Sequence, residues 1–242
     1  MTSRLRTTFL FILVFLTASV VHAQNPGTTH VFPQIVDGVW SDGSAFTSRF
    51  LIASIGGFPA RCNISLFGIG PERLTASASV LVQPASWQAI STRGQDVIAA
   101  GYARLDCSQP VFASLTYSVQ SANGTPLGIA TVPGAPVASN ALIPMVLNGR
   151  YRYGIAIANN NDPMLAVSLS FTSNGTTVLR SLQVPGRSHY VAFVDELFSV
   201  PAEGSGTFEI FANGSVGSGN FNITALLYDE GAFTNVVPAV VY

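Results

Sequence analysis

The chain has 242 residues, of which 10% are charged, and its formal net charge is −1 at pH 7. Every basic side chain is Arg, and the sequence shows neither a basic patch nor an acidic run. This charge pattern argues against nucleic acid as a partner and against an acidic cluster for cations. The length suits one large domain or two ordinary ones.

Residues 1–23 are predicted to be a secretory signal peptide. Arg4 and Arg6 give a positive start, an apolar run extends from Phe9 to Val21, and a cleavage site of the small-x-small type ends at Ala23. The run is short for a membrane-spanning helix, and no later stretch reaches the ~18 apolar residues of a span. We expect cleavage before Gln24 and a secreted, periplasmic or cell-surface location, with an uncleaved anchor as the alternative.

One strand–turn–strand pattern occurs twice, in residues 49–67 and 151–171. Each copy has an apolar strand, a turn of Asn or Gly that ends near a Pro, and an alternating strand that closes on Phe. We interpret each copy as a hairpin and the repetition as two copies of one module. The modules are expected at 24–135 and 141–242, with a linker at 133–140 whose two prolines favour stiffness.

Helix signals are sparse, and short Val, Ile, Phe and Tyr runs alternate with Gly, Pro and Asn clusters. This pattern predicts an all-β fold of two tandem antiparallel β-sandwich modules, Ig-like or jelly-roll-like. Asn123-Gly124 and Asn174-Gly175 predict type I′ hairpin turns. A short helical turn is expected at 191–198, with Phe193 and Phe198 inward. The expected strands are 29–36, 47–55, 60–68, 76–83, 98–106, 111–120 and 126–132, then 141–147, 151–158, 164–172, 176–184, 206–212, 220–228 and 234–241.

Both cysteines, Cys62 and Cys107, fall in the first module. Because exported proteins meet oxidising conditions, we expect a disulfide between them, with two buried free thiols as the alternative. Alignment of the two copies places Ala166 opposite Cys62 and Ala212 opposite Cys107. Small residues thus replace both cysteines together, as expected for two positions in contact.

The sequence shows no catalytic motif, and we expect no catalytic residue, no metal and no cofactor. A triad of His189 with Asp195 would lack a nucleophile elbow, and His30 has no motif around it. Residues 159–162 offer oxygen ligands for Ca²⁺ but are already explained as a turn. A glycosidase needs two facing carboxylates. The candidates, none in a recognisable signature, are Asp37, Asp42, Glu72, Asp96, Asp106, Asp195, Glu196, Glu203, Glu209, Asp229 and Glu230.

Four aromatic residues are candidate ligand contacts. Carbohydrate-binding sandwiches stack sugar rings on planar side chains. Trp40 lies in the polar segment 37–43, Trp87 follows a turn, and Tyr151 and Tyr153 alternate along one strand. The alternative is that these side chains close the ends of the sandwich cores.

Several segments together resemble a known type of module: Phe32-Pro-Gln-Ile-Val-Asp-Gly-Val-Trp40, Gly101-Tyr-Ala-Arg104, Ala130-Thr-Val-Pro-Gly-Ala135, Tyr153-Gly-Ile-Ala-Ile-Ala-Asn159 and Phe193-Val-Asp-Glu-Leu-Phe198. They resemble the tandem β-sandwich modules of largely uncharacterised secreted proteins of soil bacteria such as acidobacteria. The resemblance covers nearly the whole mature chain and brings no catalytic residues with it. The cysteine pair departs from the usual pattern and implies extra stapling of module one.

We therefore expect a non-catalytic, exported structural or interaction protein. Its expected partners are an extracellular glycan or protein, or a second copy that pairs through sheet edges. A carbohydrate-binding module that uses the four aromatics is one alternative, and an extracellular hydrolase is another.

Overall fold

The fold is all-β, as predicted. The computed structural model describes residues 26–213, 219–229, 232–236 and 239–241. Its antiparallel strands form one seven-stranded sheet and two five-stranded sheets, joined by one short helix, α1 (Val194–Leu197), and a 3₁₀ turn (Pro71–Arg73). The expected signal peptide lies outside the described residues.

No helix in the described part of the chain is long and apolar enough to cross a membrane.

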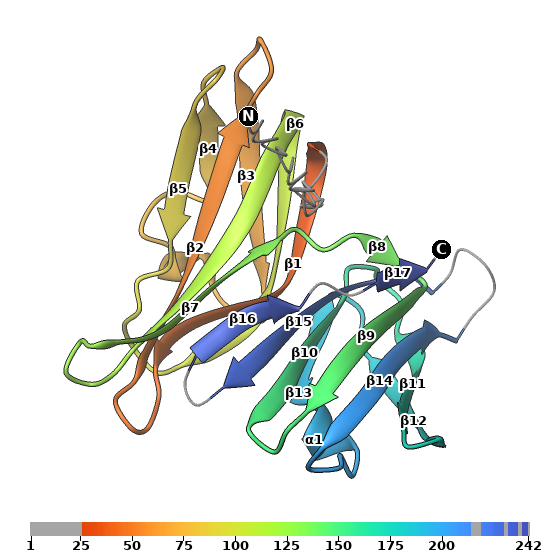
Figure 1. Ribbon diagram of the computed structural model, residues 1–242. Helices are drawn as coiled ribbons and strands as arrows, with labels where there is room; N and C mark the ends of the chain where they lie inside the picture. The colour runs from red at the N-terminus through yellow and green to blue at the C-terminus, as the bar shows by residue number, and fades with distance from the viewer. Residues whose placement is uncertain (1–25, 214–218, 230–231, 237–238, 242) are drawn as a thin grey trace, which may run out of the picture.

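Figure 1 shows the strands in two groups that meet near β1, β7, β15 and β16. The N-terminal group comprises β1 (Gly27–Val39), β2 (Ala45–Ser54), β3 (Ala60–Phe67), β4 (Ser79–Val82), β5 (Trp87–Ser91), β6 (Ala99–Gln120) and β7 (Pro126–Pro133). The C-terminal group comprises β8 (Val137–Ala138), β9 (Asn140–Leu147), β10 (Tyr151–Asn159), β11 (Leu165–Ser173), β12 (Thr176–Val184), β13 (Ser188–Phe193), α1, β14 (Gly204–Ala212), β15 (Phe221–Asp229), β16 (Ala232–Val236) and β17 (Ala239–Val241).

Strand β6 joins two layers of the N-terminal group. Sequence reasoning predicted two strands here, at 98–106 and 111–120, but the chain forms one continuous strand. Its first half lies between β3 and β1, and its second half lies between β2 and β7. The change of partners falls near Pro110, a residue type that cannot donate to a ladder and is found at sheet edges and bulges. The predicted break is thus a change of layer rather than a loop.

The two groups have matching strand orders. In the N-terminal group the layers read β4-β3-β6-β1 and β5-β2-β6-β7. In the C-terminal group they read β12-β11-β14-β9 and β13-β10-β15-β16, with β17 and β8 added at β9 and β15. The strands β14 and β15 therefore take the places of the two halves of β6. Sequence reasoning missed β5 and β13, which are short strands at sheet edges.

The repeated segments are not hairpins, and this expectation was wrong. Strand β2 pairs with β1, β5 and β6, whereas β3 pairs with β4 and β6. Likewise β10 and β11 belong to different sheets. Each repeat is a connection from one layer to the other. Its two strands face each other across a core, which explains why both are strongly apolar.

Each group has its own apolar core. Phe32, Phe50 and Leu105 are fully buried in the N-terminal core. Phe208 and Ile143 are fully buried in the C-terminal core. Alternate residues of β11 (Leu165, Val167, Leu169 and Phe171) all face that core, as expected for a strand with period 2. Phe198 also packs there, whereas Phe193, expected inward, is half-buried outside it.

Cys62 and Cys107 form the expected disulfide, between directly opposed residues of β3 and β6. In the C-terminal group, Ala212 is opposite Val167, and the Asn213 amide donates to the Ala166 carbonyl. The position aligned with Cys62 is therefore offset by one residue from the one facing Ala212. Both alanines still lie at the same crossing of two neighbouring strands.

Only one of the two predicted type I′ turns has the expected backbone. Asn174 and Gly175 both have positive φ, at 50° and 74°. At Asn123-Gly124 only the glycine is positive, at 80°, and the Gly124 amide donates to the Ser121 carbonyl. The second connection is thus a longer turn that ends in a left-handed glycine.

The connection between the groups is held on both sides. The Ala135 amide donates to the Val31 carbonyl at 2.7 Å, and β8 pairs with β15. The side-chain amide of Asn222, which is buried, donates to the carbonyls of Ala135 at 2.9 Å and Pro136 at 3.0 Å. The predicted linker is therefore an integral part of the fold.

Candidate functional site

The four predicted aromatic contacts lie in different environments. Trp40 and Trp87 have 53% and 60% of their surface exposed. Tyr151 is half-buried against the C-terminal core. Tyr153 is buried, and its hydroxyl accepts from the Val146 amide at 2.8 Å and donates to the Val146 carbonyl at 3.1 Å. Tyr153 is thus a core residue with a satisfied hydroxyl, and its predicted exposure is wrong.

The two exposed indoles do not share one platform. The Trp40 ring lies 6.5 Å from the Phe46 ring, near the start of β2. Trp87 is opposite Ala53, near the end of β2. At a rise of about 3.4 Å per residue, Phe46 and Ala53 are about 24 Å apart. Only Trp40 belongs to the largest enclosed apolar hollow of the described chain.

This hollow, the junction cleft, lies between the two groups of strands and has a volume of about 490 Å³. Its size falls within the ~300–1,000 Å³ range of small-molecule sites. The N-terminal group contributes β1, β2 and β6, and the C-terminal group contributes β10, β13, α1, β15 and β16. Its lining is predominantly carbon. Such a composition favours apolar ligands.

Small residues of β10 make room for the cleft. Ile155 and Ile157 face the C-terminal core, while Gly154 and Ala156 line the cleft. Successive side chains of a strand point to opposite faces, so this alternation separates a filled face from a hollowed one. Ala158, further along β10, packs with Val31 and Tyr102 of the N-terminal group. The same sheet is therefore covered on both faces.

Aromatic rings form one wall of the cleft. The Phe193 and Tyr228 ring centroids are 6.3 Å apart, and those of Tyr228 and Phe233 are 5.0 Å apart. These separations fall in the range of favourable aromatic pairs. Phe233 also packs against the N-terminal core. The wall thus spans three elements, β13, β15 and β16, and touches both groups.

An ion cluster borders the aromatic wall. The Arg152 guanidinium carbon lies 3.8 Å from the Phe193 ring centroid. Arg152 donates to Asp195 at 2.9 and 3.2 Å and to Glu196 at 3.1 Å, and the Phe193 amide donates to Glu196 at 3.1 Å. The hydrogen bonds to Asp195 raise the pKa of Arg152. The charges at this side of the cleft therefore satisfy one another.

A single buried acceptor lines the cleft from β1. The Oε1 atom of Gln34 is buried and has no hydrogen-bond partner within the described chain. The Gln34 carbonyl, in contrast, accepts from the Tyr117 hydroxyl at 2.7 Å. Burial raises the pKa of Tyr117, which keeps that hydroxyl protonated as a donor. A ligand donor would remove the desolvation cost of the bare oxygen.

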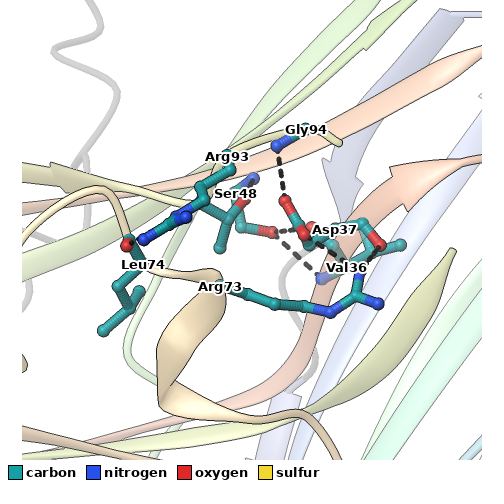
Figure 2. Close-up of polar contacts among 8 residues, drawn as sticks. Val36, Asp37, Ser48, Arg73, Leu74, Arg93 and Gly94 are labelled. Atoms are coloured by element: carbon teal, nitrogen blue, oxygen red, sulfur yellow. Dashed lines mark hydrogen bonds and ion pairs between the residues drawn. The ribbon is translucent and has the colours of Figure 1, made fainter. Parts of the chain in front are cut away.

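A buried polar network fixes the stretch of β1 that lines the cleft (Figure 2). Asp37, fully buried, pairs with Arg73 at 3.1 Å and accepts from the Gly94 amide at 2.7 Å. Ser48 Oγ accepts from the Val36 amide at 3.0 Å and donates to the Val36 carbonyl at 2.7 Å. The predicted polar loop at 37–43 thus begins inside a strand. Its first residue holds β1 rather than facing solvent.

The candidate acid–base residues are mostly engaged in ion pairs. Asp37 pairs with Arg73, Asp195 and Glu196 pair with Arg152, and Asp229 pairs with Arg150. Asp106 pairs with Arg104. Glu230 lies outside the described residues. These pairings suit structural roles, since a general acid or base needs a proton to exchange with a substrate.

The two described histidines are held apart from these carboxylates. His30 is buried, with Nε2 3.0 Å from the carbonyl oxygens of Gly27 and Val111. His189 is half-buried in β13 opposite Ala158. Burial lowers the pKa of both imidazoles. Asp195, the partner considered for His189, is held by Arg152 instead.

The turn at 159–162 is built as a structural turn. Asn159 is fully buried and donates to the carbonyls of Pro163, Val184 and Pro185 at 2.9, 3.1 and 3.1 Å. Asp162 pairs with Arg187 at 2.8 Å. Among the described residues, no group of three or more His, Cys, Asp or Glu side chains could hold a metal ion.

A scan against protein-family models and a search of curated proteins each gave no match to this chain. The cleft must therefore be interpreted from its own chemistry. Sequence reasoning singled out Trp40 but missed Gln34, Phe193, Tyr228 and Phe233, because these residues come together only when the groups meet. The alternation of small residues with Ile in 154–158 was the available signal, since it indicates a second covered face.

Proposed function

We propose that this protein is an exported, non-catalytic binding protein of two tandem β-sandwich modules, residues 24–135 and 141–242, and that the junction cleft is its binding site. The observation that carries the proposal is an apolar cleft whose two walls are held in register. The hydrogen bonds from Asn222 and the Ala135–Val31 bridge fix the walls beside the cleft. A preorganised site loses less entropy on binding.

The matching strand orders of the two groups support the two-module interpretation. The disulfide and the signal-like N-terminus support export. Fractionation of a Gram-negative expression host, with mass spectrometry of the product, tests export. We expect an N-terminus at Gln24 outside the cytoplasm; a cytoplasmic, full-length product would contradict export. The resemblance to tandem modules of soil bacteria stays a prediction.

The binding proposal is tested with Trp40 as the reporter. The chain has only two Trp residues, so Trp87→Phe leaves Trp40 as the sole indole. We expect naphthalene, an uncharged apolar probe, to change the Trp40 emission in a saturable way. Ala156→Phe, which fills the cleft, should abolish the change, whereas Leu51→Phe, at an exposed site of β2, should leave it intact. An unsaturable response, or one that survives Ala156→Phe, would overturn the proposal.

Self-association through a sheet edge is a second candidate, favoured by β12. This nine-residue edge strand pairs with β11 alone, and Leu179 on it is 70% exposed. A long edge with few charges is a template for pairing with another chain. Light scattering with Leu179→Lys tests the idea, since a dimer through β12 should dissociate. The glycan hypothesis for Trp40 and Trp87 and the hydrolase hypothesis stay predictions.

A further inference from the structure

We infer that the ligand of the junction cleft is an uncharged ring compound with one hydrogen-bond donor, such as a phenol or a cyclic alcohol, and that Gln34 Oε1 accepts from that donor. This inference rests on the proposed binding function and specifies its ligand. It combines three properties of the cleft: its shape, its charge and its one bare polar atom.

The shape favours a flat, rigid ring system. One wall consists of the Phe193, Tyr228 and Phe233 rings, and the opposite side includes Trp40. Gly154 and Ala156 leave the sheet surface low between them. Planar apolar molecules gain most from stacking against aromatic faces and from burial in such a slot. Flexible chains would lose more conformational entropy for the same buried area.

The charge distribution disfavours ionic ligands. Glu196 is the one charged side chain among the described lining residues, and its carboxylate already accepts from Arg152 and from the Phe193 amide. Burial of an unpaired carboxylate or ammonium of a ligand is costly in an apolar site. A sugar is disfavoured for a related reason, because its many hydroxyls would find few partners on a carbon lining.

The bare acceptor defines the polar end of the ligand. Gln34 Oε1 is buried and without a hydrogen-bond partner in the described chain. Its backbone carbonyl is bonded to the Tyr117 hydroxyl, which fixes β1 at this point. A ligand hydroxyl that reaches Oε1 replaces an unmade bond, so we expect a donor to improve affinity roughly three- to tenfold.

The test compares 2-naphthol, naphthalene and 2-naphthoate as probes of matched ring size. Binding is measured by isothermal titration calorimetry on the purified protein and on Gln34→Leu, with Leu51→Phe as the control. We expect 2-naphthol to bind about three- to tenfold more tightly than naphthalene. In Gln34→Leu this advantage should vanish while naphthalene still binds. Near-UV circular dichroism confirms that the variant retains its fold.

The outcomes separate the two proposals. Equal affinity for naphthol and naphthalene, or an advantage that persists in Gln34→Leu, would overturn the role of Gln34 and leave the binding function standing. Tightest binding of 2-naphthoate would overturn the uncharged class. Failure of all three probes to bind the wild-type protein would overturn the binding function and the ligand class together.

Discussion

Asn222 and Ala135 are 87 residues apart in sequence, and the side-chain amide of the first donates to the backbone carbonyl of the second at 2.9 Å. The same amide also donates to the Pro136 carbonyl. One buried side chain of β15 therefore satisfies two carbonyls of the connection between the groups. The Ala135 amide completes the arrangement by donating to Val31 of β1.

Asn222→Ala should destabilise the protein by about 2 kcal/mol, because it leaves buried carbonyls without a donor. Urea unfolding measures the loss, and hydrogen exchange at the Ala135 amide should accelerate. The matched control is Asn63→Ala, at an exposed position of β3, which should stay within about 0.5 kcal/mol of wild type. An unchanged urea midpoint in Asn222→Ala would show that the junction does not depend on this amide.

The strands were predictable because their signals are local. Period-2 burial in β11 and the apolar runs of β2 and β10 follow from the residue pattern of each segment. The pairing of these strands was not predictable, since a turn rich in Gly and Asn fits both a hairpin and a connection between layers. The repeat itself was informative, because the joint replacement of Cys62 and Cys107 by small residues indicated that the two positions are in contact.

The cleft was harder to predict because its residues come from distant segments. Gln34, Phe193 and Phe233 meet only through the contact between the two groups. Tyr153 was predicted to be exposed because its sequence neighbours are Arg residues, yet strand alternation turns it into the core. Asp37 followed the same logic in reverse: a charge in a glycine-rich segment suggested solvent, and Arg73 allowed its burial.

Arg73→Met should cost about 3 kcal/mol of unfolding free energy, because it leaves the Asp37 carboxylate buried without its counter-charge. The Asp37 side chain is only 1% exposed and that of Arg73 is 19% exposed. Arg150→Met is the matched control: its pair with Asp229 is 57% and 33% exposed, so we expect a loss of at most about 1 kcal/mol. Equal losses for the two variants in urea unfolding would contradict a structural role for the buried pair.

Cys62→Ala/Cys107→Ala should lower the unfolding free energy by about 2–4 kcal/mol, since the bond closes a long loop in the unfolded chain. The cysteines are separated by 45 residues. Alanine is the suitable replacement because Ala166 and Ala212 lie at the corresponding crossing of β11 and β14. Urea midpoints with and without reductant provide the measurement. The wild type should fall to the level of the variant in reductant, and the variant should not respond; identical midpoints throughout would argue against the crosslink.

Acidification from pH 7 to pH 5 should destabilise the protein through its buried imidazoles. Burial lowers the folded-state pKa of His30 and of His189 below the ordinary value of 6.5. The unfolded chain therefore binds more protons than the folded chain below pH 6.5. The stabilisation is complete above that pH and is lost as the pH falls toward the folded pKa values. Each imidazole adds at most about 1.4 kcal/mol per pH unit to the slope.

Urea unfolding at a series of pH values between 7 and 5 tests this dependence. His30→Gln removes the titration while keeping an amide donor near the carbonyls of Gly27 and Val111. It should make the dependence shallower, and His189→Gln should do so independently, because the two sites lie on β1 and β13. The double variant should be nearly flat over this range. A double variant that keeps the full slope would assign the pH dependence to carboxylates, and a wild type that gains stability on acidification would reverse the sign argued for both histidines.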